Sequence, residues 1–165
     1  FMMFVNDTTF TTAGNAFNMV YDTVTLSTFS AQLSYAQGEK FKVSLRGEYY
    51  IYDMLREEYA WNLPNYNVTL SSTYDLADKI LVRADVFLVG DRKANLAIVD
   101  SNVKLGPPPY TLSPFIDLNL GFEYRYTSRL SAFLNFNNIL NQKYQNVNFY
   151  KVQGFNVLGG VTYRF

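Results

Sequence analysis

The side chains available for chemistry are few in kind: carboxylates, lysines and hydroxyl groups. The 165 residues contain no histidine and no cysteine. This excludes histidine general bases, Ser-His-Asp and Cys-His nucleophile systems, Cys/His zinc sites and disulfide bonds. Asp85 and Asp91 could form a hydrolytic carboxylate pair, but acidic residues recur on any polar face of a strand. The sequence therefore predicts no catalytic, metal or cofactor site, and we expect that the protein is not an enzyme.

The charge balance argues against a nucleic-acid partner. Lys+Arg and Asp+Glu each number 14, whereas nucleic-acid-binding proteins normally carry a basic excess. The unusual feature is the aromatic content, because Phe and Tyr also number 14 each. Three aromatic residues of long connecting segments, Tyr59, Trp61 and Tyr110, are candidates for stacking on a bound ligand. Aromatic side chains also pack loops without binding anything, so both interpretations stay open.

Alternation of apolar and polar residues, which is typical of β-strands, runs through most of the chain. In the range 115–126 the even positions are apolar or aromatic, and the odd positions include Asp117, Asn119 and Glu123. No window supplies the roughly 18 apolar residues of a membrane-spanning helix. About eight strands are predicted, over the ranges 1–10, 17–36, 41–52, 66–76, 80–91, 115–126, 130–138 and 155–165.

The segments between these strands alternate in length. Helical interpretations of 53–61 and 96–99 are rejected, because Leu63-Pro64 closes the first range and the second is too short. The pattern predicts an antiparallel up-and-down meander in one domain, 1–165, with two unlike ends. Short turns are expected at 37–40, 77–79 and 127–129, and longer links at 11–16, 55–65, 93–114 and 141–153.

The two faces of the predicted strands differ in charge. From residue 17 onward, the apolar positions carry no Asp, Glu, Lys or Arg. A soluble sheet would turn this face to a core, whereas a membrane barrel turns it to lipid. Phe and Tyr gather near the strand ends, where girdles form at the two headgroup levels, and most strands have the length that a bilayer requires. The sequence predicts an all-β transmembrane barrel, with a soluble all-β binding protein as an alternative.

The last 36 residues carry two motifs. The segment LSAFLNFNNILNQKYQNVNFYKVQGFNVLGGVTYRF resembles the final two strands of TonB-dependent outer-membrane receptors. In that family a strand ends in an Asn-rich segment that leads to a tyrosine, here Asn138-Ile139-Leu140-Asn141-Gln142-Lys143-Tyr144. Asn138 and Asn141 are expected to shape this strand exit, because asparagine tolerates the left-handed conformation and bonds its own backbone.

The tail is similar to the C-terminal signal read by the bacterial barrel-assembly machinery. Gly160, Tyr163 and Phe165 occupy the signal positions, and Leu158 departs from the polar residue expected there.

The resemblance implies import of a bulky nutrient, a metal chelate or an oligosaccharide, across the bacterial outer membrane. Such receptors begin with a plug domain and an energy-coupling segment, which are followed in the sequence by about 22 strands. We therefore expect residues 1–165 to be the C-terminal part of such a barrel, without the plug domain. The implied partners are the outer-membrane lipid bilayer, the assembly machinery, and an inner-membrane energy-coupling protein reached through a missing N-terminal region. The high Tyr and Asn content suits a receptor of the Bacteroidota.

The alternative function is that of a complete eight-stranded outer-membrane barrel with a structural, adhesion or small-pore role. A barrel of this size is filled by its own side chains. Charged pairs such as Arg83 with Asp85, or Glu123 with Arg125, would then satisfy one another in the lumen.

Overall fold

The computed structural model describes residues 1–6, 17–95, 109–147 and 150–165. These residues form thirteen strands, and no helix among them is long and apolar enough to cross a membrane. Seven of the strands make one antiparallel sheet in the order β13-β10-β9-β6-β5-β4-β3. Its strands are β3 (Val24–Gln37), β4 (Phe41–Met54), β5 (Tyr66–Leu76), β6 (Ile80–Val89), β9 (Phe115–Arg125), β10 (Leu130–Asn137) and β13 (Asn156–Tyr163).

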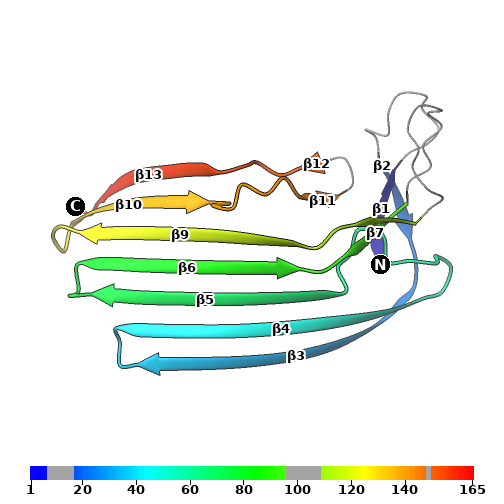
Figure 1. Ribbon diagram of the computed structural model, residues 1–165, viewed down its shortest axis with the longest axis horizontal. Coiled ribbons are helices and arrows are strands. Elements are labelled where there is room, and N and C mark those ends of the chain that lie inside the picture. Colours follow the sequence, from blue (N-terminus) through cyan, green and yellow to red (C-terminus); the bar gives the residue numbers. More distant parts are fainter. Residues whose placement is uncertain (7–16, 96–108, 148–149) are drawn as a thin grey trace.

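The two ends of this sheet are unlike, as the connection lengths predict. The three short turns lie together at one end, at the left of Figure 1, and the longer links gather at the other. The turn between β5 and β6 is closed by a hydrogen bond from Lys79 N to Leu76 O (3.2 Å), and both central residues, Ala77 and Asp78, have positive φ. This conformation matches the right-handed twist of neighbouring strands. The end with the short turns is called the turn end below, and the other the loop end.

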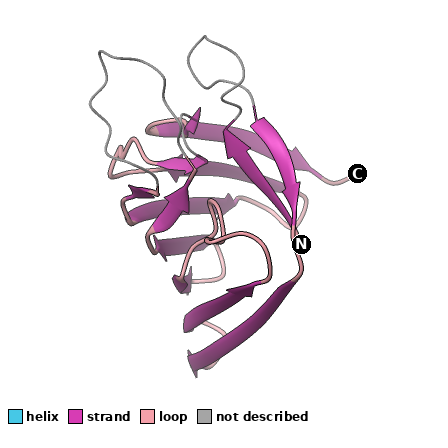
Figure 2. Ribbon diagram, turned by 90° about the vertical axis from the view of Figure 1, so that its right-hand side faces the viewer, coloured by secondary structure: helices cyan, strands magenta, loops and turns pink. Residues whose placement is uncertain are grey.

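The seven-stranded sheet is open. Viewed from the loop end it is bent into an arc (Figure 2), and its outermost strands, β3 and β13, have no second neighbour among the described residues. An up-and-down antiparallel wall is therefore confirmed. A self-closed eight-stranded barrel is not what these residues form, so the fold does not favour the alternative of a complete small barrel.

The predicted strand 17–36 is wrong as a single element. It is divided into β2 (Phe17–Tyr21) and β3, with a bend at Asp22. The Asp22 carboxylate is buried and accepts backbone hydrogen bonds from Glu57 (2.8 Å), Arg56 (2.9 Å) and Thr23 (2.7 Å). These bonds, the one from Glu57 above all, lower the pKa of Asp22 and keep its carboxylate charged. Local bonding by one carboxylate thus overrides a twenty-residue alternation.

The remaining short strands belong to the loop end. Strand β1 (Met2–Asn6) is the described part of the predicted strand 1–10, and it pairs with β2. Range 53–61 contains no helix, as expected, whereas 96–99 lies outside the described residues. Two further hairpins stand within the long links: β7 (Arg92–Ala94) with β8 (Tyr110–Leu112), and β11 (Gln145–Val147) with β12 (Tyr150–Lys151).

One face of the large sheet, the outward face, is uncharged between its two aromatic levels and largely exposed. On β4 it begins with Phe41 and reaches Tyr49 eight residues later; on β5, Tyr74 and Tyr66 stand beside these two. Eight residues of strand span about 27 Å, close to the roughly 25 Å apolar band of outer-membrane barrels. Aromatic rings therefore stand at two levels, with only uncharged residues between them.

Leu70 lies halfway between the two aromatic levels, beside Leu45 and Val86 on the outward face. Leu70→Arg should lower the unfolding free energy of the full-length protein by about 2–4 kcal/mol, because arginine is costly at the bilayer midplane. Denaturant titration in lipid vesicles measures the change. Ser71→Arg is the matched control, since residue 71 points to the polar face opposite Asp85. Equal losses for both substitutions would contradict a lipid-facing assignment of Leu70.

Candidate functional site

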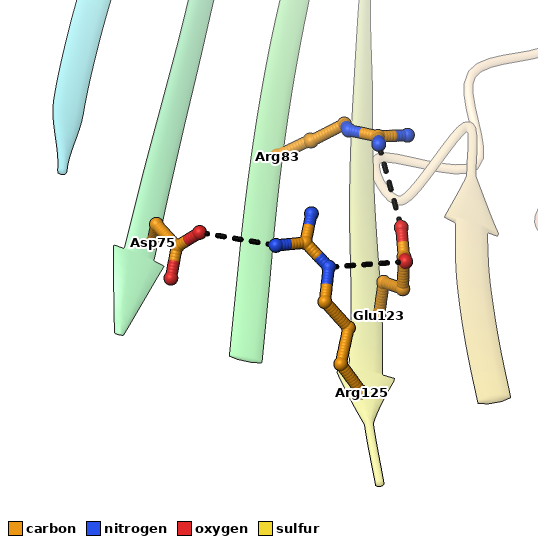
Figure 3. A network of polar contacts seen from close by, with 4 residues as sticks. All are labelled: Asp75, Arg83, Glu123 and Arg125. Carbon is orange, nitrogen blue, oxygen red and sulfur yellow. Dashed lines mark hydrogen bonds and ion pairs between the residues drawn. The ribbon is translucent and has the colours of Figure 1, made fainter. Parts of the chain in front are cut away.

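The inner face of the sheet carries a chain of ion pairs near the turn end (Figure 3). The Arg125 guanidinium lies between two carboxylates, with Nη1 3.3 Å from Asp75 Oδ2 and Nε 3.4 Å from Glu123 Oε1. Arg83 Nη2 lies 3.5 Å from the other oxygen of Glu123. Four residues from three strands thus balance their charges across the wall, and the expected pairing of Glu123 with Arg125 is confirmed.

The other expected pair is not formed. Arg83 contacts Glu123 on the neighbouring strand β9 instead of Asp85. Asp85 accepts a hydrogen bond from the Ser71 hydroxyl (2.6 Å), and Asp91 accepts one from Asn65 Nδ2 (2.8 Å). Each carboxylate of the conceivable hydrolytic pair therefore has a structural partner of its own.

A stack of three side chains joins separate links at the loop end. The Arg92 guanidinium carbon lies 4.9 Å from the centre of the Phe115 ring, and the Tyr144 ring lies parallel to Phe115 at 3.6 Å. Cation–π and stacking contacts of this kind strengthen when water is excluded. Arg92 is only 3% exposed, so the guanidinium group in this stack is shielded from solvent.

Hydrogen bonds fix the stack to its surroundings. Arg92 donates from Nη1 to the Gln145 carbonyl (2.7 Å) and from Nη2 to the Ser113 carbonyl (2.9 Å). The Tyr144 hydroxyl donates to Asp117 Oδ2 (2.7 Å), and burial together with this bond raises the pKa of Tyr144 to about 12. Tyr144 consequently keeps its proton at neutral pH. One arginine and one tyrosine thus tie the links after β6, β8 and β10 together.

The Asn-rich segment forms the strand exit that its sequence predicts. Asn138 and Asn141 both have positive φ, at 48° and 49°. Asn138 Nδ2 donates to the carbonyls of Gln142 (3.0 Å) and Gln153 (3.1 Å), while its Oδ1 accepts from Gln142 N (3.0 Å). Asn141 Oδ1 accepts from Phe155 N (3.1 Å). The segment therefore joins the exit of β10 to the entrance of β13.

A hollow opens above the stack, between β8 and the segment that follows the Asn-rich turn. Its wall combines three aromatic rings, two side-chain amides, an ammonium group and a guanidinium group, and Tyr110 is 40% exposed. Such a mixture can stack on a ring and donate hydrogen bonds to oxygen atoms. The lining includes Arg92, Tyr110, Pro114, Gln142, Lys143 and Gln145.

The other two predicted ligand contacts, Tyr59 and Trp61, are not among the residues that line this hollow. Trp61 is 6% exposed, packs with Met3 and Val5, and donates from Nε1 to Glu57 Oε2 (2.8 Å). Tyr59 is half-buried, with its ring 5.3 Å from that of Trp61. The structure therefore does not bring Tyr59, Trp61 and Tyr110 together into one surface.

The residues of the assembly motif lie on both faces of β13. Tyr163 and Phe165 are exposed on the outward side, and their rings meet edge to face at 5.1 Å. Gly160 points to the inner side, where an added Cβ would lie 2.7 Å from the ring of Phe133. A Cβ at this position would force the Phe133 ring to move, which supplies a packing reason for Gly160 beside its place in the motif.

Sequence reasoning missed Arg92 and Phe115, and it placed Asp22 inside the predicted strand 17–36. Nothing in the local pattern distinguishes Arg92 from any other charged residue in a loop. Asp22 did carry a signal, because a carboxylate next to a threonine is typical of a turn. Tyr144 was identified only as the end of a motif, without its partners.

Asn138→Ala should lower the unfolding free energy of the full-length protein by about 2–4 kcal/mol, since three side-chain hydrogen bonds and a left-handed residue are lost. Denaturant unfolding measures the loss. Asn146→Ala, an exposed asparagine of the same link, is the control and should change stability by at most about 0.5 kcal/mol. An unchanged unfolding free energy in Asn138→Ala would show that the strand exit does not depend on these bonds.

Comparison with known proteins finds no matching family model and no matching curated protein. Solved structures do match. The outer-membrane ferripyoverdine receptor of Pseudomonas aeruginosa, bound to ferripyoverdine, is 16% identical, with a TM-score of 0.68 over 98% of this chain and 23% of its own. The FpvAI–pyocin S2 complex gives 17% identity and a TM-score of 0.69 over 89% of this chain and 20% of the matched chain.

A variant of the ferric enterobactin receptor PfeA, also from Pseudomonas aeruginosa, is 18% identical, with a TM-score of 0.63 over 82% of this chain and 22% of its own. The chain spans about a fifth of the length of these structures. The fold expected from the terminal motifs is thereby confirmed. The chain has the β-barrel fold of TonB-dependent outer-membrane receptors, over a stretch equal to about a fifth of such a receptor.

Proposed function

We propose that this chain is part of the barrel of a bacterial outer-membrane receptor that imports a bulky nutrient with energy from the inner membrane. The observation that carries the proposal is the outward face of a receptor-type sheet, uncharged between two aromatic levels about one bilayer apart. An apolar, uncharged face of this kind is unfavourable in water, whereas the hydrocarbon of a bilayer requires it. The protein then acts by binding and transport rather than by covalent catalysis.

The orientation follows from the two ends of the sheet. Outer-membrane barrels have short turns on the periplasmic side and longer loops outside. The turn end accordingly faces the periplasm, and the loop end, with its three small hairpins and the Arg92 stack, faces the medium. This orientation places the hollow edged by Tyr110 where a nutrient first arrives.

The nutrient is a metal chelate or an oligosaccharide. Two of the similar receptors are named for ferripyoverdine and ferric enterobactin, which supports the first class. In the hollow, the exposed Tyr110 ring and the amides of Gln142 and Gln145 suit a ligand that combines flat rings with many oxygen atoms. Tyr59 and Trp61 form a second, more buried aromatic group on the same end of the sheet.

Two partners follow from the proposal. An energy-coupling protein of the inner membrane would act through a region of the receptor outside these 165 residues. The barrel-assembly machinery would recognise Gly160 and Tyr163 on β13 and Phe165 just beyond it, and the exposed edge of β13 offers backbone groups for strand pairing.

Tyr110→Cys tests both orientation and ligand capture. These residues contain no native cysteine, so a membrane-impermeant maleimide reports the introduced one. On intact cells the reagent should label Tyr110→Cys, and a bulky adduct there should reduce nutrient uptake at least tenfold by blocking the hollow. Uptake of the radiolabelled nutrient measures the effect.

Asp78→Cys, in a turn at the opposite end, is the matched control and should stay unlabelled until the cells are broken. The parent receptor gives the background. Labelling of Asp78→Cys alone on intact cells would show that the orientation is the reverse. Unchanged nutrient uptake by the labelled Tyr110→Cys receptor would show that the hollow does not take part in nutrient capture.

Deletion of Phe165 tests whether this residue is an assembly signal or only stabilises the end of the strand. As an assembly signal, its loss should lower the amount of receptor in the outer membrane severalfold, while refolding of the purified protein in detergent changes little. Immunoblots of membrane fractions, beside refolding yields, measure the two effects. Normal membrane levels after the deletion would leave Phe165 only as an anchor of the strand end.

A further inference from the structure

The inner face of the sheet differs between its two halves. Over the ranges 30–36 on β3, 42–48 on β4 and 67–75 on β5, the inner positions carry no large apolar side chain. Each other strand of the sheet places at least one on this face: Phe87 of β6, Phe115 of β9, Phe133 of β10 and Leu158 of β13. Water therefore suits the first half, called the polar half below, and is unfavourable over the second.

Hydroxyl groups lie side by side in the middle of the polar half. Ser34, Ser44 and Ser71 are in register on the three strands. Gln32 Nε2 donates to the hydroxyls of Ser34 (3.3 Å) and Ser44 (3.1 Å), and these two hydroxyls lie 3.1 Å apart. The uncharged side chains that are called the polar track below are Gln32, Ser34, Ser44, Thr69, Ser71 and Thr73.

The polar track lines two adjoining hollows. Both hollows include Gln32, Ser44 and Ser71 in their walls, so they are continuous along the sheet. The first extends toward the loop end as far as Glu48, and the second toward the turn end as far as Lys42. From Lys42 to Glu48 strand β4 rises about 20 Å, which is most of the roughly 25 Å apolar band of an outer-membrane barrel. The track therefore runs in the direction that crosses the membrane.

The chemistry of the polar track suits a solute that moves. A hydroxyl group donates one hydrogen bond, accepts two and rotates to fit its partner. It can therefore exchange hydrogen bonds with a passing oxygen atom without a change in the strand that carries it. The carboxylate nearest to the loop end of the track, that of Glu48, is paired with Arg46 (2.7 Å), so it does not offer a strong site that would retain a cation.

We propose that the polar track lines the path of the nutrient through the barrel, and that this nutrient has a surface rich in hydroxyl and carbonyl oxygen atoms. The inference rests on the proposed function, because it requires a barrel that imports. The hydroxyls and the Gln32 amide replace part of the hydration shell of the nutrient as it passes, and many weak contacts let it leave each position again. The apolar half suits packing against other parts of the receptor instead.

The first experiment places an obstacle in the path. Ser44→Cys in the full-length receptor is reacted with a bulky, membrane-impermeant maleimide, and a gel shift reports the reaction. Import into intact cells is followed with two radiolabelled probes, ferric hydroxamate or catecholate chelates and oligosaccharides of glucose. The adduct should lower import at least about tenfold, because the width of a pore decides what passes. Binding of the probe to cells treated with an uncoupler, which measures capture at the loop end, should stay the same.

Asn135→Cys is the matched control. Asn135 is a polar residue of the inner face that lies in register with Lys42 across the sheet, but it belongs to the other half, opposite Leu158. Its adduct should leave import within about twofold of the wild-type rate, since it lies outside the path. Thr69→Cys, on the polar track, is a second test position and should behave as Ser44→Cys does.

A further pair of variants tests the hydroxyl groups themselves. Ser34→Ala, Ser44→Ala removes two hydroxyls with little change in volume and should lower import at least about threefold, the effect of one or two lost hydrogen bonds. Ser34→Thr, Ser44→Thr keeps the hydroxyls and should import at the wild-type rate. Immunoblots of outer membranes give the amount of receptor by which each import rate is divided.

The outcomes distinguish the polar track from the proposed function. Import by the wild type with undiminished import by the Ser44→Cys and Thr69→Cys adducts overturns the track and leaves the receptor function intact. Equal losses for the Ser44→Cys and Asn135→Cys adducts overturn it too, as does a thiol in Ser44→Cys that never reacts while the receptor imports. Wild-type import by the alanine variant overturns the role of the hydroxyls. A wild-type receptor that imports neither probe overturns both proposals.

Discussion

The antiparallel hydrogen-bond ladder is the constraint on which the rest of this structure depends. In the hydrocarbon of a bilayer the backbone has no water to bond, so every N–H and C=O of a spanning strand needs a partner on the next strand. The ladder supplies it over seven strands and forces side chains to alternate between the two faces. Uncharged residues outside and ion pairs inside are two results of that single geometry.

Outside the ladder, order comes from polar side chains that replace it locally. Asp22 collects three backbone N–H groups and turns the chain. Asn138 donates to two carbonyls and accepts from one N–H at a strand exit, and Arg92 donates to carbonyls of two separate links. Each of these side chains is buried, and each serves backbone groups that lie beyond the reach of a neighbouring strand. The loop end is therefore held by a few anchoring residues, in contrast to the distributed bonding of the wall.

This difference explains how much could be predicted. Periodicity identified the long strands, the short turns and the polarity of each face, because one repeating physical rule sets all three. The Asn-rich motif predicted the exit at Asn138 and Asn141, since left-handed asparagines are a local property. The Arg92–Phe115–Tyr144 stack could not be found in this way. Its members are distant in sequence and meet only when three links fold over the same edge. The break at Asp22 was missed because its partners, near residue 56, lie on another connection.

The open edges of the sheet determine how this wall can exist. Strands β3 and β13 each leave about half of their backbone groups without a ladder partner among the described residues. Several kcal/mol for each unpaired group in hydrocarbon add up to tens of kcal/mol for the two edges. In the proposed receptor, the wall therefore has no stable state in lipid with its margins bare, and closure of the barrel must accompany insertion. A substitution that breaks strand pairing at either margin would then destabilise the whole proposed barrel, and not only the strand that carries it.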